Sequence, residues 1–157
     1  MEPLRDIKQM LAAGPTIAAA AHPDAVVHAP GVRFTVLTPR RRRLEHDPAG
    51  AFEDRPSQVF WARRQPVPDY RVERAPGRIE IDTGALRLRY APSERGLVRD
   101  RLSVEVAATG ARWQPGDPNP GNLGGTVRTL DGADGAVQLE PGLMSRSGWG
   151  VVDDSAG

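Results

Sequence analysis

Two neighbouring segments of this chain alternate apolar and charged residues around a glycine turn, and this pattern constrains the fold more than any other feature. Residues 79–82 read Ile-Glu-Ile-Asp and residues 86–90 read Leu-Arg-Leu-Arg-Tyr, with Thr-Gly-Ala between them. A period of two places alternate side chains on opposite faces of a strand, and a short connection with glycine is a common hairpin loop. The pattern predicts an antiparallel hairpin with one apolar face. Its charged residues are expected to face each other across the strands: Glu80, Asp82, Arg87 and Arg89.

Short strands are expected along most of the remaining chain. The same alternation occurs in residues 32–36 and 102–106. The 17 glycines and 15 prolines are spread along the sequence as turns between strands. These features predict an all-β, mostly antiparallel sandwich or barrel. Weaker strand signals lie at residues 58–61, 70–73, 136–139 and 149–152.

The size of the chain fits one domain with a short leader. Its 157 residues lie within the range of a single domain, about 100–200 residues. Apolar residues recur at helical spacing between Pro3 and Leu11, before Gly14 and Pro15 end the pattern. Residues 1–22 are therefore expected to form a short leading helix and linker, and residues 23–157 a β domain.

Composition argues against several classes of function. The formal net charge is +1, without the basic surplus of a nucleic-acid-binding protein. The dense run Arg40–Arg43 is followed closely by acidic residues that can neutralise it. No stretch approaches the roughly 20 apolar residues of a membrane span. The sequence contains no cysteine, which is compatible with a reducing compartment, so a cytoplasmic location is expected.

The polar residues do not form a recognisable catalytic or metal-binding set. The three histidines, at positions 22, 28 and 46, match no metal-site spacing, so neither a metal nor another cofactor is expected. A glycosidase needs two carboxylates that flank the scissile bond. The pairs Asp131 with Asp134 and Asp153 with Asp154 stand beside glycine or serine, as turn aspartates do. We therefore predict no catalytic residue in this chain.

Aromatic residues offer one candidate for sugar binding. Trp61 and Trp149 lie beside apolar residues and are expected in the core. Trp113 adjoins the Pro/Gly-rich loop 114–125, where an exposed indole could stack on a sugar ring.

Four segments, taken in order, resemble the amino-terminal β-sandwich domain of glycoside hydrolase family 31, the α-glucosidase and α-xylosidase group. The resemblance extends over residues 23–155 and implies a galactose-mutarotase-like sandwich packed on a catalytic (β/α)8 barrel. The segments are residues 33–40 (RFTVLTPR), 52–61 (FEDRPSQVFW), 122–132 (NLGGTVRTLDG) and 139–149 (LEPGLMSRSGW).

The resemblance implies a supporting function. In that family the catalytic aspartates lie on the barrel, and a barrel of about 250 residues cannot be contained in this chain. The domain is expected to brace the barrel of the same parent protein and to contribute a loop, within residues 122–134, to the rim of a pocket for an α-linked oligosaccharide. The residues implied at the rim or interface are Asn122, Arg128, Asp131, Trp149 and Asp153.

The resemblance leaves one alternative and one departure. The alternative is a stand-alone carbohydrate-binding module that uses exposed aromatic residues such as Trp113. The departure is that Arg41 and Arg42 occupy positions where apolar strand residues are expected in relatives. Because an unpaired buried guanidinium is costly, that strand is expected to be exposed, paired with Glu45 or Asp47, or poorly formed.

Overall fold

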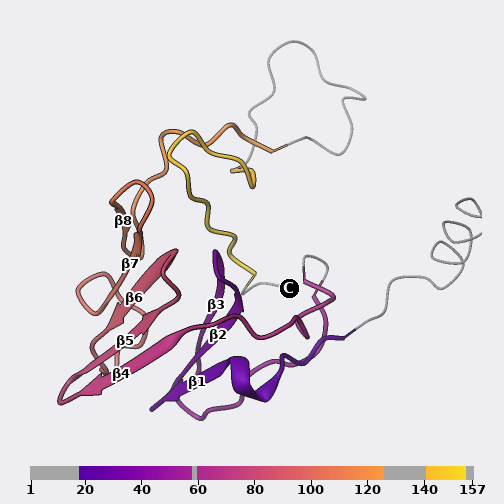
Figure 1. Ribbon diagram of the computed structural model, residues 1–157, viewed down its shortest axis with the longest axis vertical. Coiled ribbons are helices and arrows are strands. Elements are labelled where there is room, and N and C mark those ends of the chain that lie inside the picture. The colour runs from indigo at the N-terminus through magenta and orange to yellow at the C-terminus, as the bar shows by residue number, and fades with distance from the viewer. Residues whose placement is uncertain (1–17, 58–59, 126–140, 155–157) are drawn as a thin grey trace, which may run out of the picture.

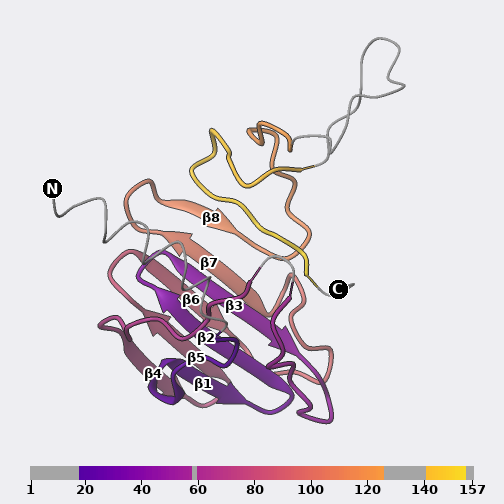
Figure 2. The same cartoon turned by 90° about the vertical axis from the view of Figure 1, so that its right-hand side faces the viewer.

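Two antiparallel sheets pack face to face in the computed structural model, which describes residues 18–57, 60–125 and 141–154 (Figures 1 and 2). The smaller sheet has the order β1-β2-β3, and a single 3-10 turn, Pro23–Ala25, precedes it. The larger sheet has the order β4-β5-β6-β7-β8, so strands that follow one another in sequence are neighbours throughout. The strands are β1 (Val26–Ala29), β2 (Val32–Thr38), β3 (Arg41–His46), β4 (Arg71–Ala75), β5 (Arg78–Asp82), β6 (Leu86–Tyr90), β7 (Leu102–Val106) and β8 (Ala111–Trp113).

The predicted all-β, antiparallel class is confirmed, whereas some of the weaker strands are not. Residues 149–152 join no sheet, and neither do residues 60 and 61. The strand expected at 136–139 and the leading helix at 3–11 lie outside the described residues. Among the described residues, no helix is long and apolar enough to cross a membrane.

The β5–β6 hairpin forms as its sequence predicts. Glu80 lies opposite Arg89, and Asp82 lies opposite Arg87. Both pairs are ion pairs, with the Nε atoms of the arginines 2.9 Å from the carboxylate oxygens. Gly84 has a φ of 76°, which glycine adopts without steric cost, and its N–H donates to Asp82 Oδ1 at 2.6 Å. This backbone hydrogen bond, together with Arg87, lowers the pKa of Asp82.

The hydrophobic core lies between the two sheets. Phe34 of β2 packs edge-on against Tyr90 of β6, with ring centroids 5.3 Å apart. Other buried side chains of both sheets surround this pair, while the charged residues of β5, β6 and β7 occupy the opposite face of the larger sheet. The remaining core residues are Val27, Val32, Val36, Ile79, Ile81, Leu88 and Leu102.

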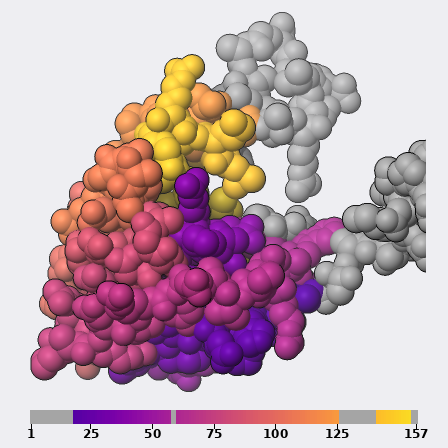
Figure 3. Space-filling model, in the orientation of Figure 1, coloured from indigo at the N-terminus to yellow at the C-terminus, as the bar shows by residue number. Residues whose placement is uncertain are grey.

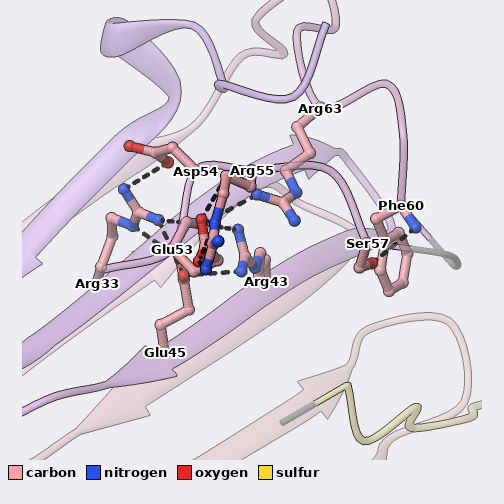
Figure 4. A network of polar contacts seen from close by, with 9 residues as sticks. All are labelled: Arg33, Arg43, Glu45, Glu53, Asp54, Arg55, Ser57, Phe60 and Arg63. Atoms are coloured by element: carbon pink, nitrogen blue, oxygen red, sulfur yellow. Dashed lines mark hydrogen bonds and ion pairs between the residues drawn. The ribbon is translucent and has the colours of Figure 1, made fainter. Parts of the chain in front are cut away.

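Strand β2 is buried on both faces, although its alternation predicts a half-buried strand. Val32, Phe34 and Val36 face the core, while Arg33 and Thr35 are buried on the opposite side. The chain around residues 20–23 and 53–54, together with Arg63, covers that outer side. Ion pairs there satisfy the buried guanidinium of Arg33 (Figure 4).

Candidate functional site

The unequal sheets leave an open groove along one side of the sandwich. Strand β3 is the last strand of the smaller sheet, so the inner face of β7 and β8 extends past it (Figure 2). The resulting groove has a volume of about 2080 Å³, which is more than a small ligand needs. Its wall on the larger sheet is apolar and includes Leu86, Val104, Val106 and Trp113.

Arg42 lies in this groove, on the same face of β3 as the core residues. It stands opposite Val36 in the register, so its side chain emerges on the inner side of the sheet. Its Nη2 donates to Thr83 Oγ1 and to the Leu86 carbonyl, both at 3.1 Å. Its Nε and Nη1 are buried and have no hydrogen-bond partner among the described residues. Burial lowers the pKa of Arg42 to about 10, against the smaller opposing effects of Asp82 and Tyr70.

This geometry corrects the expectation for the arginine strand. Strand β3 is well formed, and Arg42 is half-buried and held by a loop of the opposite sheet instead of by Glu45 or Asp47. Arg41 is exposed, which is one of the three alternatives expected for this strand. Glu45 pairs with Arg33 and Arg43 on the outer face of the sheet.

Two loops form the upper end of the groove, and asparagine side chains tie them together. Asn122 Oδ1 accepts hydrogen bonds from the N–H groups of Gly124 and Gly142, and its Nδ2 donates to the Gly142 carbonyl, each at 2.8 Å. Asn119 donates to the Trp149 carbonyl at 2.9 Å and accepts from the Ser145 hydroxyl. Figure 3 shows the result on one face of the molecule, where the yellow segment 141–154 lies against the orange loop 114–125.

The structure brings together some of the residues that the sequence singled out. Trp113, Trp149 and Asp153 all line the groove. Asn122 does not line it, because its side chain is used to join the two loops. Arg128 and Asp131 lie outside the described residues.

The expected roles of the tryptophans change in the structure. Trp61 is 48% exposed, so its predicted place in the core is wrong. Trp149 is half-buried at the groove. Trp113 is half-buried and packs against the core, so part of its indole is not available for stacking on a sugar.

The groove carries large apolar side chains that are exposed to solvent. Leu143, Val151 and Val152 line it from segment 141–154 and are 74%, 51% and 39% exposed. Apolar side chains gathered at one concave surface mark an interaction site more strongly than scattered ones do. Within the described ranges, no group of three or more His, Cys, Asp or Glu side chains is placed to hold a metal ion.

The sequence patterns do not identify two arginines of the structure as site residues: the half-buried Arg42 and the buried Arg63. Arg42 stands out in the sequence only as a departure from an apolar pattern. The register of β3 against β2 would have placed Arg42 on the core face, but nothing local marks Arg63. Comparison with known proteins adds no assignment, because no protein-family model and no curated protein matches this chain.

Proposed function

We propose that this chain is a non-catalytic β-sandwich domain of a retaining α-glycosidase, which braces the catalytic (β/α)8 barrel of the same parent protein. In this proposal the groove face packs on the barrel, and the loops above the groove reach the rim of a pocket for an α-linked oligosaccharide. The resemblance of the four sequence segments to glycoside hydrolase family 31 supports the choice of partner. The cysteine-free sequence is compatible with a reducing compartment, and the proposal places the parent enzyme in the cytoplasm.

The observation that carries the proposal is the incomplete closure of the sandwich at the groove. In the part of the chain that the structure describes, no strand of the smaller sheet lies opposite the apolar inner face of β7 and β8, and β3 pairs with a neighbour on only one edge. Soluble proteins usually cover such edges and apolar faces with further protein. A large, permanently attached domain would cover the apolar face and the free edge of β3 together.

The charge in the groove fits the same kind of partner. Two donor atoms of Arg42 are buried without a partner among the described residues. Arg42 lines the groove, so a docked surface that presents a carboxylate near its guanidinium would compensate part of the cost of burying the charge. The partner surface is therefore expected to be apolar, with at least one acceptor facing Arg42.

The first test is to sequence the gene on both sides of these 157 codons. The proposal expects an open frame that encodes a (β/α)8 barrel with two catalytic aspartates. A frame without a barrel would refute the proposal. Binding of α-linked oligosaccharides by the chain itself, lost in Trp113→Ala, would then identify the alternative, a stand-alone carbohydrate-binding module.

The second test uses the parent enzyme and two matched valine variants. Val151 lies in the groove, whereas Val72, which is also exposed, lies on β4 away from it. Val151→Glu would place a charge against the barrel and should lower the midpoint of thermal unfolding of the parent enzyme. Val72→Glu should leave that midpoint unchanged. Equal effects of the two variants would show that the groove is not the docking face.

A further inference from the structure

A second cavity lies on the outer side of the smaller sheet, away from the core. It has a volume of about 210 Å³. Its lining combines apolar and charged side chains. The apolar residues are Ala20, Ala21, Pro23 and Val26. The polar residues are Arg33, Arg43 and Arg63, together with Asp54, Thr35 and His28.

Backbone hydrogen bonding fixes the position of Arg63 beside the cavity. Its N–H donates to the Ala18 carbonyl at 2.7 Å, next to a parallel bridge between Ala18 and Ala62. The residue is only 3% exposed, and its Nη1 donates to the Glu53 carbonyl at 3.0 Å. Its Nε is buried and has no hydrogen-bond partner in the described part of the chain. Arg63 is therefore a buried cation beside the cavity, with one donor that is unsatisfied among the described residues.

Three guanidinium groups converge on one neutral oxygen (Figure 4). The Glu53 carbonyl accepts from Arg33 Nη2 at 3.1 Å, Arg43 Nη1 at 2.9 Å and Arg63 Nη1 at 3.0 Å. A carbonyl oxygen has two lone pairs, so it has no capacity left for a further donor. The Glu53 carboxylate forms an ion pair with Arg55, whose Nη2 lies 2.5 Å from Glu53 Oε2.

The carboxylates of the cluster pair with Arg33 and Arg43 but not with Arg63. Glu45 lies 2.7 Å from Arg33 and 3.0 Å from Arg43, and Asp54 lies 2.9 Å from Arg33. Among the described residues, no carboxylate lies within ion-pair distance of Arg63. A buried charge without a counter-ion is strongly unfavourable, and a bound anion would supply one. Within the described residues of this cluster, Arg63 is the one cation without a carboxylate partner, so a ligand with one negative charge would balance it.

We propose that this cavity binds a small organic monocarboxylate. The carboxylate would lie at the arginines of the lining, and the apolar part of the molecule would contact Ala20, Ala21 and Pro23. The volume fits this class of ligand, because an apolar cavity of about 150 Å³ in another protein holds benzene. The cavity of about 210 Å³ therefore has room for a molecule of the size of benzoate. This inference does not depend on the proposed role of the groove.

Benzoate binding to the full chain tests the proposal. Titration calorimetry at constant ionic strength should show saturable binding of benzoate and no binding of benzyl alcohol, which has a similar shape without the charge. Arg63→Gln should weaken benzoate binding by at least tenfold, the effect of losing about 1.4 kcal/mol of binding free energy. The matched control is Arg95→Gln, since Arg95 forms an exposed ion pair with Asp100 and does not line the cavity.

A second variant changes affinity in the opposite direction. Asp54 is mostly exposed and competes for Arg33 in the cavity wall, so Asp54→Asn should tighten benzoate binding several-fold without disturbing the fold. This variant keeps the test decisive if Arg63→Gln does not fold. Unchanged affinity in the folded variants, or equal binding of benzyl alcohol, would overturn the proposal. Tighter binding of inorganic phosphate than of benzoate would overturn the assignment to monocarboxylates.

Discussion

The two tyrosines of this chain are expected to respond in opposite ways to removal of the hydroxyl group. Tyr90 is 1% exposed and its ring packs against Phe34, but its hydroxyl has no hydrogen-bond partner among the described residues. The Tyr70 hydroxyl donates to the Asp24 carbonyl at 2.5 Å and so ties β4 to the start of the smaller sheet. Each Tyr→Phe substitution removes one oxygen and keeps the ring.

The magnitudes follow from the state of each hydroxyl. A buried polar group without a partner costs about 1–3 kcal/mol, so Tyr90→Phe should raise the free energy of unfolding by about 1 kcal/mol or more. A satisfied hydrogen bond contributes about 0.5–1.5 kcal/mol, so Tyr70→Phe should lower the free energy of unfolding by that amount. For a chain of this size, 1 kcal/mol corresponds to a shift in melting temperature of roughly 2–4 °C.

Urea denaturation followed by tryptophan fluorescence measures both changes on the same scale. The midpoint should rise in Tyr90→Phe and fall in Tyr70→Phe, while the slope m stays constant in both, because the buried area hardly changes. If Tyr90→Phe lowers the midpoint as much as Tyr70→Phe does, the Tyr90 hydroxyl has a partner, and the reasoning is refuted.

Three further substitutions test the hairpin, a close contact and the core. Asp82→Asn should lower the free energy of unfolding by about 0.5–1 kcal/mol at pH 7. The pKa of Asp82 is lower in the folded state than in the unfolded state. Its contribution to stability is therefore complete above the ordinary aspartate pKa of about 3.9 and is lost as pH falls through the folded-state pKa. The urea midpoints of the variant and the parent should converge at that low pH. Gly96→Ala should lower the melting temperature markedly, because the φ of Gly96 is 67° and an added Cβ atom would lie 2.4 Å from the His46 ring. An unchanged melting temperature would refute that contact. Leu88→Ala should cost about 2–5 kcal/mol in the same urea assay, because Leu88 is fully buried, and a loss below 1 kcal/mol would contradict its place in the core.

The larger sheet could be predicted from sequence because its information is local. Strands β5 and β6 alternate strictly and share a glycine turn, so the hairpin and its charge pairs follow from neighbouring residues. Strand β7 shows the same alternation and continues the sheet. In each strand, a shift of one residue would move the apolar side chains to the charged face, and this fixes the register.

The rest depends on contacts between distant residues. The two hydrogen-bond acceptors of Arg42 lie 41 and 44 residues further along the chain. Arg63 donates to the Glu53 carbonyl, 10 residues earlier in the chain, and neither residue lies in a strand. The outer face of β2 is buried by irregular chain, which leaves no periodic signal. Residues 149–152 combine aromatic and β-branched residues, but propensity for strand does not supply a neighbouring strand to pair with.

Arg33 and Arg42 lie on opposite faces of the smaller sheet, and their charges are compensated differently. On the outer face, the carboxylates of Glu45 and Asp54 compensate the buried charge of Arg33. On the inner face, the acceptors of Arg42 among the described residues are a hydroxyl and a carbonyl, and burial lowers its pKa. A guanidinium left in this state reduces the stability of the domain by itself, since an apolar residue of similar volume would avoid the desolvation cost. In the proposed assembly, an acceptor on the docked barrel would compensate this charge, so replacing Arg42 with an apolar residue should weaken docking more than it weakens the isolated domain.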